Sequence, residues 1–340
     1  GVTGVQTCAL PILRRIRLLL VEKHRIGRRI IRMRRDAIKD FYVRGREVRE
    51  TELVDEGRIV IDGILDRWRE GAMYVKDESV FNVFEELLDG CLNGPSRMMQ
   101  KIDQRVQDID NGASPFFEGE KDLLQRAVGQ LTSHRTQRRD YLLRLLDSEI
   151  AFERGPKLAI AASDTTEAFE LYECLKNRFG EFRIVASLNG MSQEVARASM
   201  EMFATKSDCR VIVVDRDSEE GCNLQSATRL INFDLPFNIN RIEQRIGRVD
   251  RYSDRDRGKV KVEILSENSS WVQGWHHFLR EGVEIFDDSV ATLQLPLVGA
   301  MADLTKSLLW EGNSAFGEKL ENLRANLRQE RKRVANLEKT

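Results

Sequence analysis

The sequence has no long hydrophobic run and few cysteines. No apolar run approaches the roughly 20 residues that a membrane helix needs, and charged residues make up 32% of the chain. This composition predicts a soluble cytoplasmic protein with no membrane partner. Apart from Cys8, the cysteines lie far apart and form no CxxC pair or Cys/His cluster, so the sequence supports neither a disulfide framework nor a structural zinc site.

The sequence also lacks the GxxxxGK[ST] loop with which ATP-driven motors cradle phosphates. The nearest approach to a magnesium-binding carboxylate pair is LVDE at 53–56. We discount it because it follows the polar residues Glu50, Thr51 and Glu52 rather than a buried strand. By itself, therefore, this chain is predicted not to turn over ATP, and no metal site is predicted in it.

The net charge of −1 hides a strong asymmetry. Between Leu13 and Arg49 there are fourteen Lys or Arg residues against four acids. Such a block is typical of a segment that faces nucleic acid, or of a solvated helix. Composition leaves both interpretations open.

Both ends of the chain are unusual. Residues 2–12 read VTGVQTCALPI, a peptide that a common sequencing adapter encodes codon for codon, so we expect residues 1–12 to be an artefact. A secretion signal is the alternative, but no methionine begins the segment and no basic stretch precedes its apolar residues. The chain stops at Thr340 within a charged helical pattern. We therefore expect the sequence to be a fragment.

Four regions follow residue 12. Residues 13–60 are basic, and residues 61–140 are mostly helical by their apolar spacing. Residues 267–340 are helical too, and we expect them to contain one arm of a helical hairpin. In the region 141–266, short β-branched runs alternate with amphipathic stretches. Strands are predicted at 158–162, 182–186, 210–214, 229–233 and 260–265, and helices at 166–179, 192–203 and 240–251.

This alternation predicts an α/β fold with a mainly parallel sheet, helices on both of its faces, and helical additions at the N-terminal and C-terminal ends. In open sheets of this kind, ligands bind at the carboxyl ends of the strands. The loops that follow the predicted strands also carry the residues most suited to chemistry.

The sharpest pattern lies in the predicted helix at 240–251. Helical spacing places one set of polar residues three or four apart on one face: Arg241, Gln244, Arg245, Arg248 and Arg251. Ile239, Ile242, Ile246 and Val249 fall on the other face. We expect the apolar face to pack on the sheet and the guanidinium groups to face outward, where they suit phosphate oxygens. A solvated or salt-bridged arginine face is the alternative.

The pattern QxxGRxxR at 244–251, after LINFDLPFN at 230–238, resembles motif VI of superfamily-two helicases and translocases. This version is similar to the RapA group of the Swi/Snf family. The resemblance implies a RecA-like lobe in which Arg248 and Arg251 reach the γ-phosphate of ATP held on another lobe, while Gln244 orients them. Arginine fingers of this kind contribute about a thousand-fold or more in rate.

The loop 218–225 resembles motif V of the same family and follows a predicted strand. By this resemblance, Gly221 and Asn223 contact the nucleotide, and Glu220, Asn223 and Gln225 contact DNA. A simple turn capped by asparagine is the alternative. Relatives often carry Ser or Thr just after the strand, where this chain has Asp215 and Arg216, which leaves the coupling role of this loop open.

Two further loops resemble family motifs that contact DNA. Ser163 and Thr165 follow the strand at 158–162 as in motif IV, and Asn189 and Gly190 precede the helix at 192–203. Helix capping explains Ser, Thr and Asn at such positions equally well. The order and spacing of these elements from residue 157 to residue 251 match the family without a large gap.

The resemblance extends beyond this region. The basic run at 28–35, with Phe41 and 44–47, resembles the family's exit from lobe one into the brace between the lobes, which we assign to 13–60. Trp275, Phe278, Phe286 and the helix at 320–337 resemble the C-terminal extension, which we assign to 267–340. Residues 61–140 become a helical linker or protrusion, and 141–266 the second motor lobe.

The complete protein is therefore expected to be a bacterial DNA-dependent ATPase that moves along or remodels complexes on double-stranded DNA. ATP with Mg²⁺ would be bound mainly by a first lobe that this sequence lacks, and RNA polymerase is a partner implied by the family. One alternative is the motor of a phage-defence system, with proteins of that system as partners. The other is a non-catalytic lobe whose arginines hold a nucleic-acid backbone.

Overall fold

A six-stranded, all-parallel sheet organises the molecule. A computed structural model of the chain describes residues 46–132, 137–150, 155–218, 222–250, 259–287, 290 and 292–337, all of which belong to one of the two units into which its contacts divide the chain. The strand order is β1-β6-β5-β2-β4-β3. The strands span β1 (Arg46–Leu53), β2 (Leu158–Ala161), β3 (Ile184–Ser187), β4 (Val211–Val214), β5 (Arg229–Asn232) and β6 (Val260–Glu267).

The inner strands are apolar because both of their faces are covered. Every residue of β2, β3, β4 and β5 is buried, as parallel strands with helices on both sides require. All five strands predicted from the β-branched runs are present, with ends that differ by one or two residues. The largest difference is in β3, which begins at Ile184 rather than at Phe182, whose side chain is exposed.

The sixth strand, β1, corrects the sequence-based interpretation. Residues 46–53 pair in parallel with β6, from Arg46 opposite Val260 to Leu53 opposite Glu267. LVDE at 53–56 therefore begins at the last residue of a strand, but this strand is a half-exposed edge strand and not the buried strand that a magnesium-binding carboxylate pair follows. The strand escaped prediction because it lies at the edge of the sheet, where half-buried and exposed positions alternate and charged side chains are tolerated.

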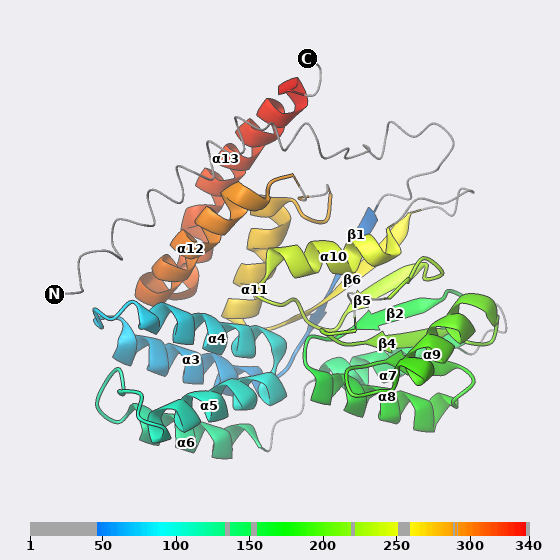
Figure 1. Ribbon diagram of the computed structural model, residues 1–340, viewed down its shortest axis with the longest axis horizontal. Coiled ribbons are helices and arrows are strands. Elements are labelled where there is room, and N and C mark those ends of the chain that lie inside the picture. The colour runs from blue at the N-terminus through cyan, green and yellow to red at the C-terminus, as the bar shows by residue number, and fades with distance from the viewer. Residues whose placement is uncertain are drawn as a thin grey trace. The chain divides into compact units, whose positions relative to one another are not determined.

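Helices cover both faces of the sheet (Figure 1). On one face, α7 (Gln137–Ile150) and α8 (Thr165–Phe179) share a hydrophobic cluster with alternate residues of the strands. On the other face, α9 (Gln193–Thr205), α10 (Ile239–Val249) and α11 (Ser270–His277) pack against the remaining strand residues. This alternation follows from the two-residue period of a strand. It confirms the predicted α/β fold class.

The second face also carries the helical additions. These are α3 (Arg58–Ala72), α4 (Ser79–Asn93), α5 (Pro95–Asp110) and α6 (Glu120–Leu131), with α12 (Gln294–Glu311) and α13 (Ala315–Leu337) near the C-terminus. A three-residue 3₁₀ turn, Gly312–Ser314, joins α12 to α13, and the two helices pack on each other as the expected hairpin. None of the described helices is both long and apolar enough to cross a membrane.

A row of buried aromatic rings connects these additions. Trp68 of α3 stacks on Phe84 of α4 at 6.4 Å between ring centroids, and Phe84 meets Trp271 of α11 edge-on at 6.3 Å. Trp271 in turn contacts Phe316 of α13 at 6.2 Å. Aromatic pairs at such distances contribute about 0.5–1.5 kcal/mol each beyond their burial. The helices between β1 and β2 and those after β6 therefore share one core with the sheet.

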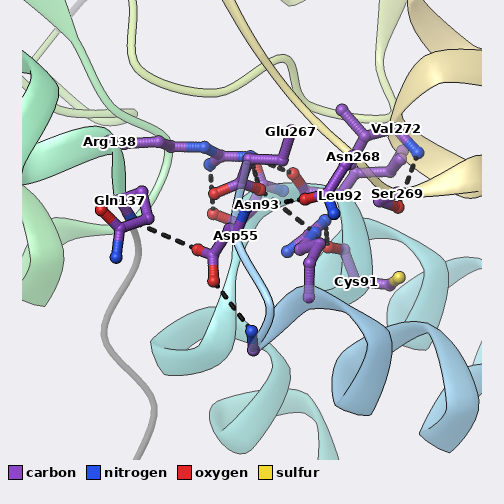
Figure 2. A network of polar contacts seen from close by, with 12 residues as sticks. Asp55, Cys91, Leu92, Asn93, Gln137, Arg138, Glu267, Asn268, Ser269 and Val272 are labelled. Atoms are coloured by element: carbon purple, nitrogen blue, oxygen red, sulfur yellow. Dashed lines mark hydrogen bonds and ion pairs between the residues drawn. The ribbon is translucent and has the colours of Figure 1, made fainter. Parts of the chain in front are cut away.

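A buried ionic network joins the same parts (Figure 2). The carboxylate of Glu267, at the end of β6, accepts a hydrogen bond from the guanidinium group of Arg138 in α7 at 2.8 Å and lies 3.1 Å from Nε of Arg58 in α3. All three side chains are fully buried. Arg138 also donates to the carbonyl of Asn93 at the end of α4 (2.9 Å). Nearby, the Asp55 carboxylate accepts the backbone N–H of Gly57 (3.0 Å) and of Gln137 (3.1 Å).

Candidate functional site

Three loops converge at the carboxyl ends of β2, β3 and β4, and one carboxylate joins them. Asp215 directly follows β4 and is fully buried. One of its oxygens accepts the hydroxyl of Thr165, after β2, and the backbone N–H of Asn189, after β3, both at 2.8 Å. Its other oxygen accepts the backbone N–H (3.0 Å) and the hydroxyl (2.6 Å) of Ser218.

An open groove of about 650 Å³ lies over the loops after β3 and β4 and beside α9. Asn189, Gly190 and Asn223 all line it, together with Arg197 of α9 and Asp217. Asn189 donates its side-chain amide to Asp217 at 2.8 Å, and Gly190 adopts a φ of +88° that favours glycine. The structure thus brings three of the predicted DNA-binding residues together in one hollow.

The other residues predicted to bind DNA lie differently. Ser163 is buried, and its backbone N–H donates to both carboxylate oxygens of Asp234 (2.8 and 3.1 Å). Thr165 is half-buried, with its hydroxyl on Asp215. Gln225 is half-buried, and its backbone N–H donates to the side-chain oxygen of Asn223 at 3.2 Å. Glu220 and Gly221 fall outside the described residues.

The arginine-rich helix α10 begins as predicted, at a polar cap. The side chain of Asn238 accepts the backbone N–H of Arg241 at 3.1 Å, and the four apolar residues Ile239, Ile242, Ile246 and Val249 are buried. Gln244 is exposed and Arg248 is half-buried. These two therefore lie on the outward side, whereas Arg251 falls outside the described residues.

Arg245 corrects the expectation of a uniform outward arginine face. Its side chain is buried and donates to the carbonyl of Asp234 (2.7 Å), the hydroxyl of Ser163 (3.2 Å) and the side-chain oxygen of Asn232 (3.3 Å). It lies three residues after Ile242 and four before Val249, so helical spacing places it at the edge of the buried face. Arg245 therefore holds α10 to the sheet.

Arg248 is placed differently from Arg245. No hydrogen bond or ion pair of its side chain is present among the described residues, and nothing lies within 4 Å of the position where a Cβ of the neighbouring Gly247 would be. A half-buried guanidinium group with no partner among the described residues can receive an anion.

Two residues at the site, Asp234 and Arg241, have partners that the sequence did not predict. Asp234 is buried between Ser163 and Arg245, and burial raises its pKa, although Arg245 and Arg138 oppose this shift. Arg241 donates to the carbonyl of Arg216 at 2.6 Å, which joins α10 to the loop after β4. An aspartate directly after a buried strand was the signal available for Asp234. No local signal identifies the long-range contact of Arg241.

The described residues contain no group of three or more His, Cys, Asp or Glu that could hold a metal ion. What the described part offers a nucleotide is the outward side of α10, with Gln244 and Arg248, and Asn223 at the groove. These groups suit contacts to phosphate oxygens or to a sugar hydroxyl.

Comparison with known proteins identifies this region. Residues 137–253 match the family model described as the helicase conserved C-terminal domain. This stretch is a helicase C-terminal domain. It begins at α7, ends just after α10, and includes Asp215, the groove and the arginine helix.

The helicase C-terminal domain also has relatives of known name. The chain is 31% identical over 145 residues to the RNA polymerase-associated protein RapA of two Vibrio cholerae serotype O1 strains, M66-2 and ATCC 39315. The aligned part covers 42% of this chain and 15% of each relative. The distant similarity to the RapA group that was predicted from the motifs is therefore confirmed.

The chain also matches two solved ATPase structures at low identity and with TM-scores below 0.5. The C-terminal part of the Fun30 ATPase domain is 13% identical, with 79% of this chain and 98% of that one covered and a TM-score of 0.46. The Sulfolobus solfataricus SWI2/SNF2 ATPase C-terminal domain is 13% identical, with 72% and 91% covered and a TM-score of 0.41.

Proposed function

We propose that the chain is the C-terminal part of an ATP-dependent double-stranded-DNA translocase or remodeller of the Swi/Snf family. In this proposal it supplies arginine fingers to a nucleotide and holds the DNA backbone. The helicase C-terminal domain and the similarity to RapA support the family. Because the aligned part spans 15% of the RapA relatives, the ATPase activity is proposed for the complete protein, and this chain alone is proposed to be inactive.

The observation that carries the proposal is the groove at the carboxyl ends of the strands. Asn189, Gly190 and Asn223 meet there although they come from two different loops, and the groove also carries the charged side chains of Arg197 and Asp217. Amide and guanidinium groups bind phosphate oxygens without reading base sequence. A motor that moves along any duplex needs contacts of this kind.

The second element is the outward side of α10. Arg248, which is half-buried on this side, is proposed to contact the γ-phosphate of ATP bound with Mg²⁺ on a first lobe, together with Arg251. Gln244 is proposed to orient the two arginines. Gly221 and Asn223 are proposed to contact the same nucleotide, and Glu220, Gln225, Ser163 and Thr165 to complete the DNA-facing loops.

The partners follow from the family. Double-stranded DNA is the proposed substrate track, and RNA polymerase is a proposed partner because the RapA relatives are described as polymerase-associated. A cytoplasmic location is part of the same proposal.

The deciding experiment measures ATPase rate with and without duplex DNA, on a protein that includes the first lobe. Arg248→Ala and Arg251→Ala are each expected to lower the turnover rate by about a thousand-fold while ATP binding persists. Arg126→Ala, which removes an exposed arginine of α6, is the matched control and should leave the rate unchanged. Duplex DNA is expected to stimulate the wild-type rate.

Turnover that is indifferent to both arginines would remove the arginine-finger proposal. Absence of turnover, with duplex binding retained, would favour a non-catalytic nucleic-acid-binding lobe. DNA-stimulated turnover that never associates with RNA polymerase would leave the motor intact and favour a different partner, such as a phage-defence protein.

A further inference from the structure

The most highly connected carboxylate at the groove is Asp215, the residue that departs from the motif V pattern. It is fully buried, and its two oxygens accept four hydrogen bonds from residues after three different strands. Two of the donors are the backbone N–H groups of Asn189 and Ser218, whose positions set the course of the loops themselves. A serine or threonine hydroxyl cannot accept four such bonds at once.

The neighbouring residue extends this connection to the arginine helix. The carbonyl of Arg216 accepts a hydrogen bond from the guanidinium group of Arg241 at 2.6 Å. Arg241 lies in the first turn of α10, seven residues before Arg248. A chain of direct bonds therefore runs from Thr165 and Asn189, through Asp215 and Arg216, to the helix that carries Arg248.

We propose that Asp215 is a positioning residue that holds the two groove loops, after β3 and β4, in register with the start of α8 and, through the adjacent Arg216, links them to α10. The predicted effect of Asp215 on DNA binding rests on the proposed function above, whereas its predicted effect on the positions of the loops does not. The two residues that depart from the family pattern then preserve the connection between the DNA groove and the arginine helix by a different chemistry.

A simple electrostatic argument predicts the opposite change in DNA affinity when Asp215 is replaced. A carboxylate beneath a groove for a polyanion repels it, so removing the charge of Asp215 should strengthen DNA binding. If Asp215 positions the loops, the same change should weaken binding, because the backbone at Asn189 loses its anchor. The direction of the change in affinity therefore separates the two roles.

The loop-holding role is tested first, without DNA, by amide hydrogen exchange. Asp215→Asn keeps the size of the side chain but turns an N–H donor toward groups that are themselves donors. We expect the amides of Asn189 and Ser218 to exchange about tenfold faster or more in this variant. Asp208→Asn is the matched control, because Asp208 lies exposed before the same strand, and it should leave both amides unchanged.

The second measurement is fluorescence anisotropy of labelled duplex DNA with the 340-residue chain, at several salt concentrations. Asp215→Asn is expected to weaken binding about five- to tenfold and to reduce the salt dependence, since fewer phosphate contacts then form. Asp208→Asn removes the same charge and should leave the affinity equal or slightly higher.

Each outcome has a definite meaning. Unchanged exchange at both amides would overturn the positioning role, and so would an affinity that stays equal or rises in Asp215→Asn. Faster exchange in a chain whose wild type does not bind duplex DNA would keep the positioning role and remove the proposed function. If Asp215→Asn does not fold, Ser218→Ala removes one donor and keeps the carboxylate, and faster exchange at Asn189 is then expected, with unchanged exchange contradicting the proposal.

Discussion

At the residue scale, Glu167 in the first turn of α8 is a buried carboxyl group whose pKa is strongly shifted. Its side chain is buried, and its Oε2 has no hydrogen-bond partner among the described residues. Burial raises its pKa to about 8, although Arg138 opposes the shift, and the nearby carboxylates of Asp234, Asp164 and Glu267 raise it further. The folded protein therefore holds a proton at neutral pH that the unfolded chain releases.

This gives a pH dependence with a definite sign. The unfolded glutamate loses its proton near its ordinary pKa of 4.5, whereas the folded one keeps it until about pH 8. Between these values the unfolded state binds fewer protons, so the contribution of Glu167 to stability falls as pH rises. Urea unfolding should show Glu167→Gln gaining stability over wild type between pH 5.5 and pH 8, by about 1–3 kcal/mol. The exposed Glu170→Gln on the same helix is the control, and an equal pH slope in wild type and Glu167→Gln would contradict the assignment.

Single residues also show where sequence reasoning stops. Helical periodicity predicted α10, its cap and its four buried apolar positions, but it grouped Arg245 with the outward arginines. The partners that make Arg245 an interior residue, Ser163 and Asp234, come from loops after two other strands. A buried arginine is stable only where such acceptors meet it, and their meeting depends on the strand order, which periodicity does not give.

At the element scale, Gly274 of α11 lies at a close contact between helices. A Cβ at this position would lie 2.6 Å from Cδ2 of Phe316 in α13. That ring cannot move aside easily, because it packs on Trp271 and on Trp275 at 6.2 and 6.1 Å. The glycine therefore permits the close approach that joins the C-terminal hairpin to the rest of the fold.

Replacing Gly274 by alanine should consequently destabilise the protein despite alanine's better helix propensity. Overpacking of a well-filled core costs about 1–3 kcal/mol, which outweighs the roughly 1 kcal/mol gained from the backbone. Gly299→Ala in α12 is the matched control, since nothing lies within 4 Å of its Cβ position, and it should stabilise slightly. Thermal unfolding of both variants checks this, and a gain in Tm for Gly274→Ala would show that α13 is more loosely held.

The elements themselves were predictable to unequal degrees. The β-branched runs of the inner strands differ clearly from their surroundings, because strands covered on both faces must be apolar. The edge strand β1 carries charged residues along most of its length, and the same residues are compatible with a solvated helix. The groove residues could be predicted from the spacing of motifs, whereas the four-bond role of Asp215 requires knowing that β2, β3 and β4 are neighbours.

At the scale of the whole molecule, the helices between β1 and β2 and those after β6 are one structure with the sheet. One hydrophobic cluster includes Trp68 of α3, Ile212 of β4, Ile246 of α10 and Phe316 of α13. The sequence predicted the helices of residues 61–140 from their spacing, but gave no sign of where they would pack. Their place is fixed by long-range contacts, among which the network around Glu267 is the most buried (Figure 2).

That network leads to a prediction about cooperativity. Glu267 is the one carboxylate that lies within ion-pair distance of both Arg58 and Arg138 among the described residues, and all three side chains are fully buried. Glu267→Gln leaves two buried guanidinium groups with less compensation, which should cost about 3–5 kcal/mol. Because the shared hydrophobic cluster remains, the chain should still unfold in a single transition, with tryptophan fluorescence and far-UV circular dichroism coincident in urea.

The exposed Glu52→Gln on β1 is the matched control and should leave the midpoint unchanged. Two separate transitions in the wild type would mean that the helices of residues 58–131 form an independent unit, and a midpoint for Glu267→Gln equal to that of Glu52→Gln would mean that the buried ion pairs do not fasten these helices to the sheet.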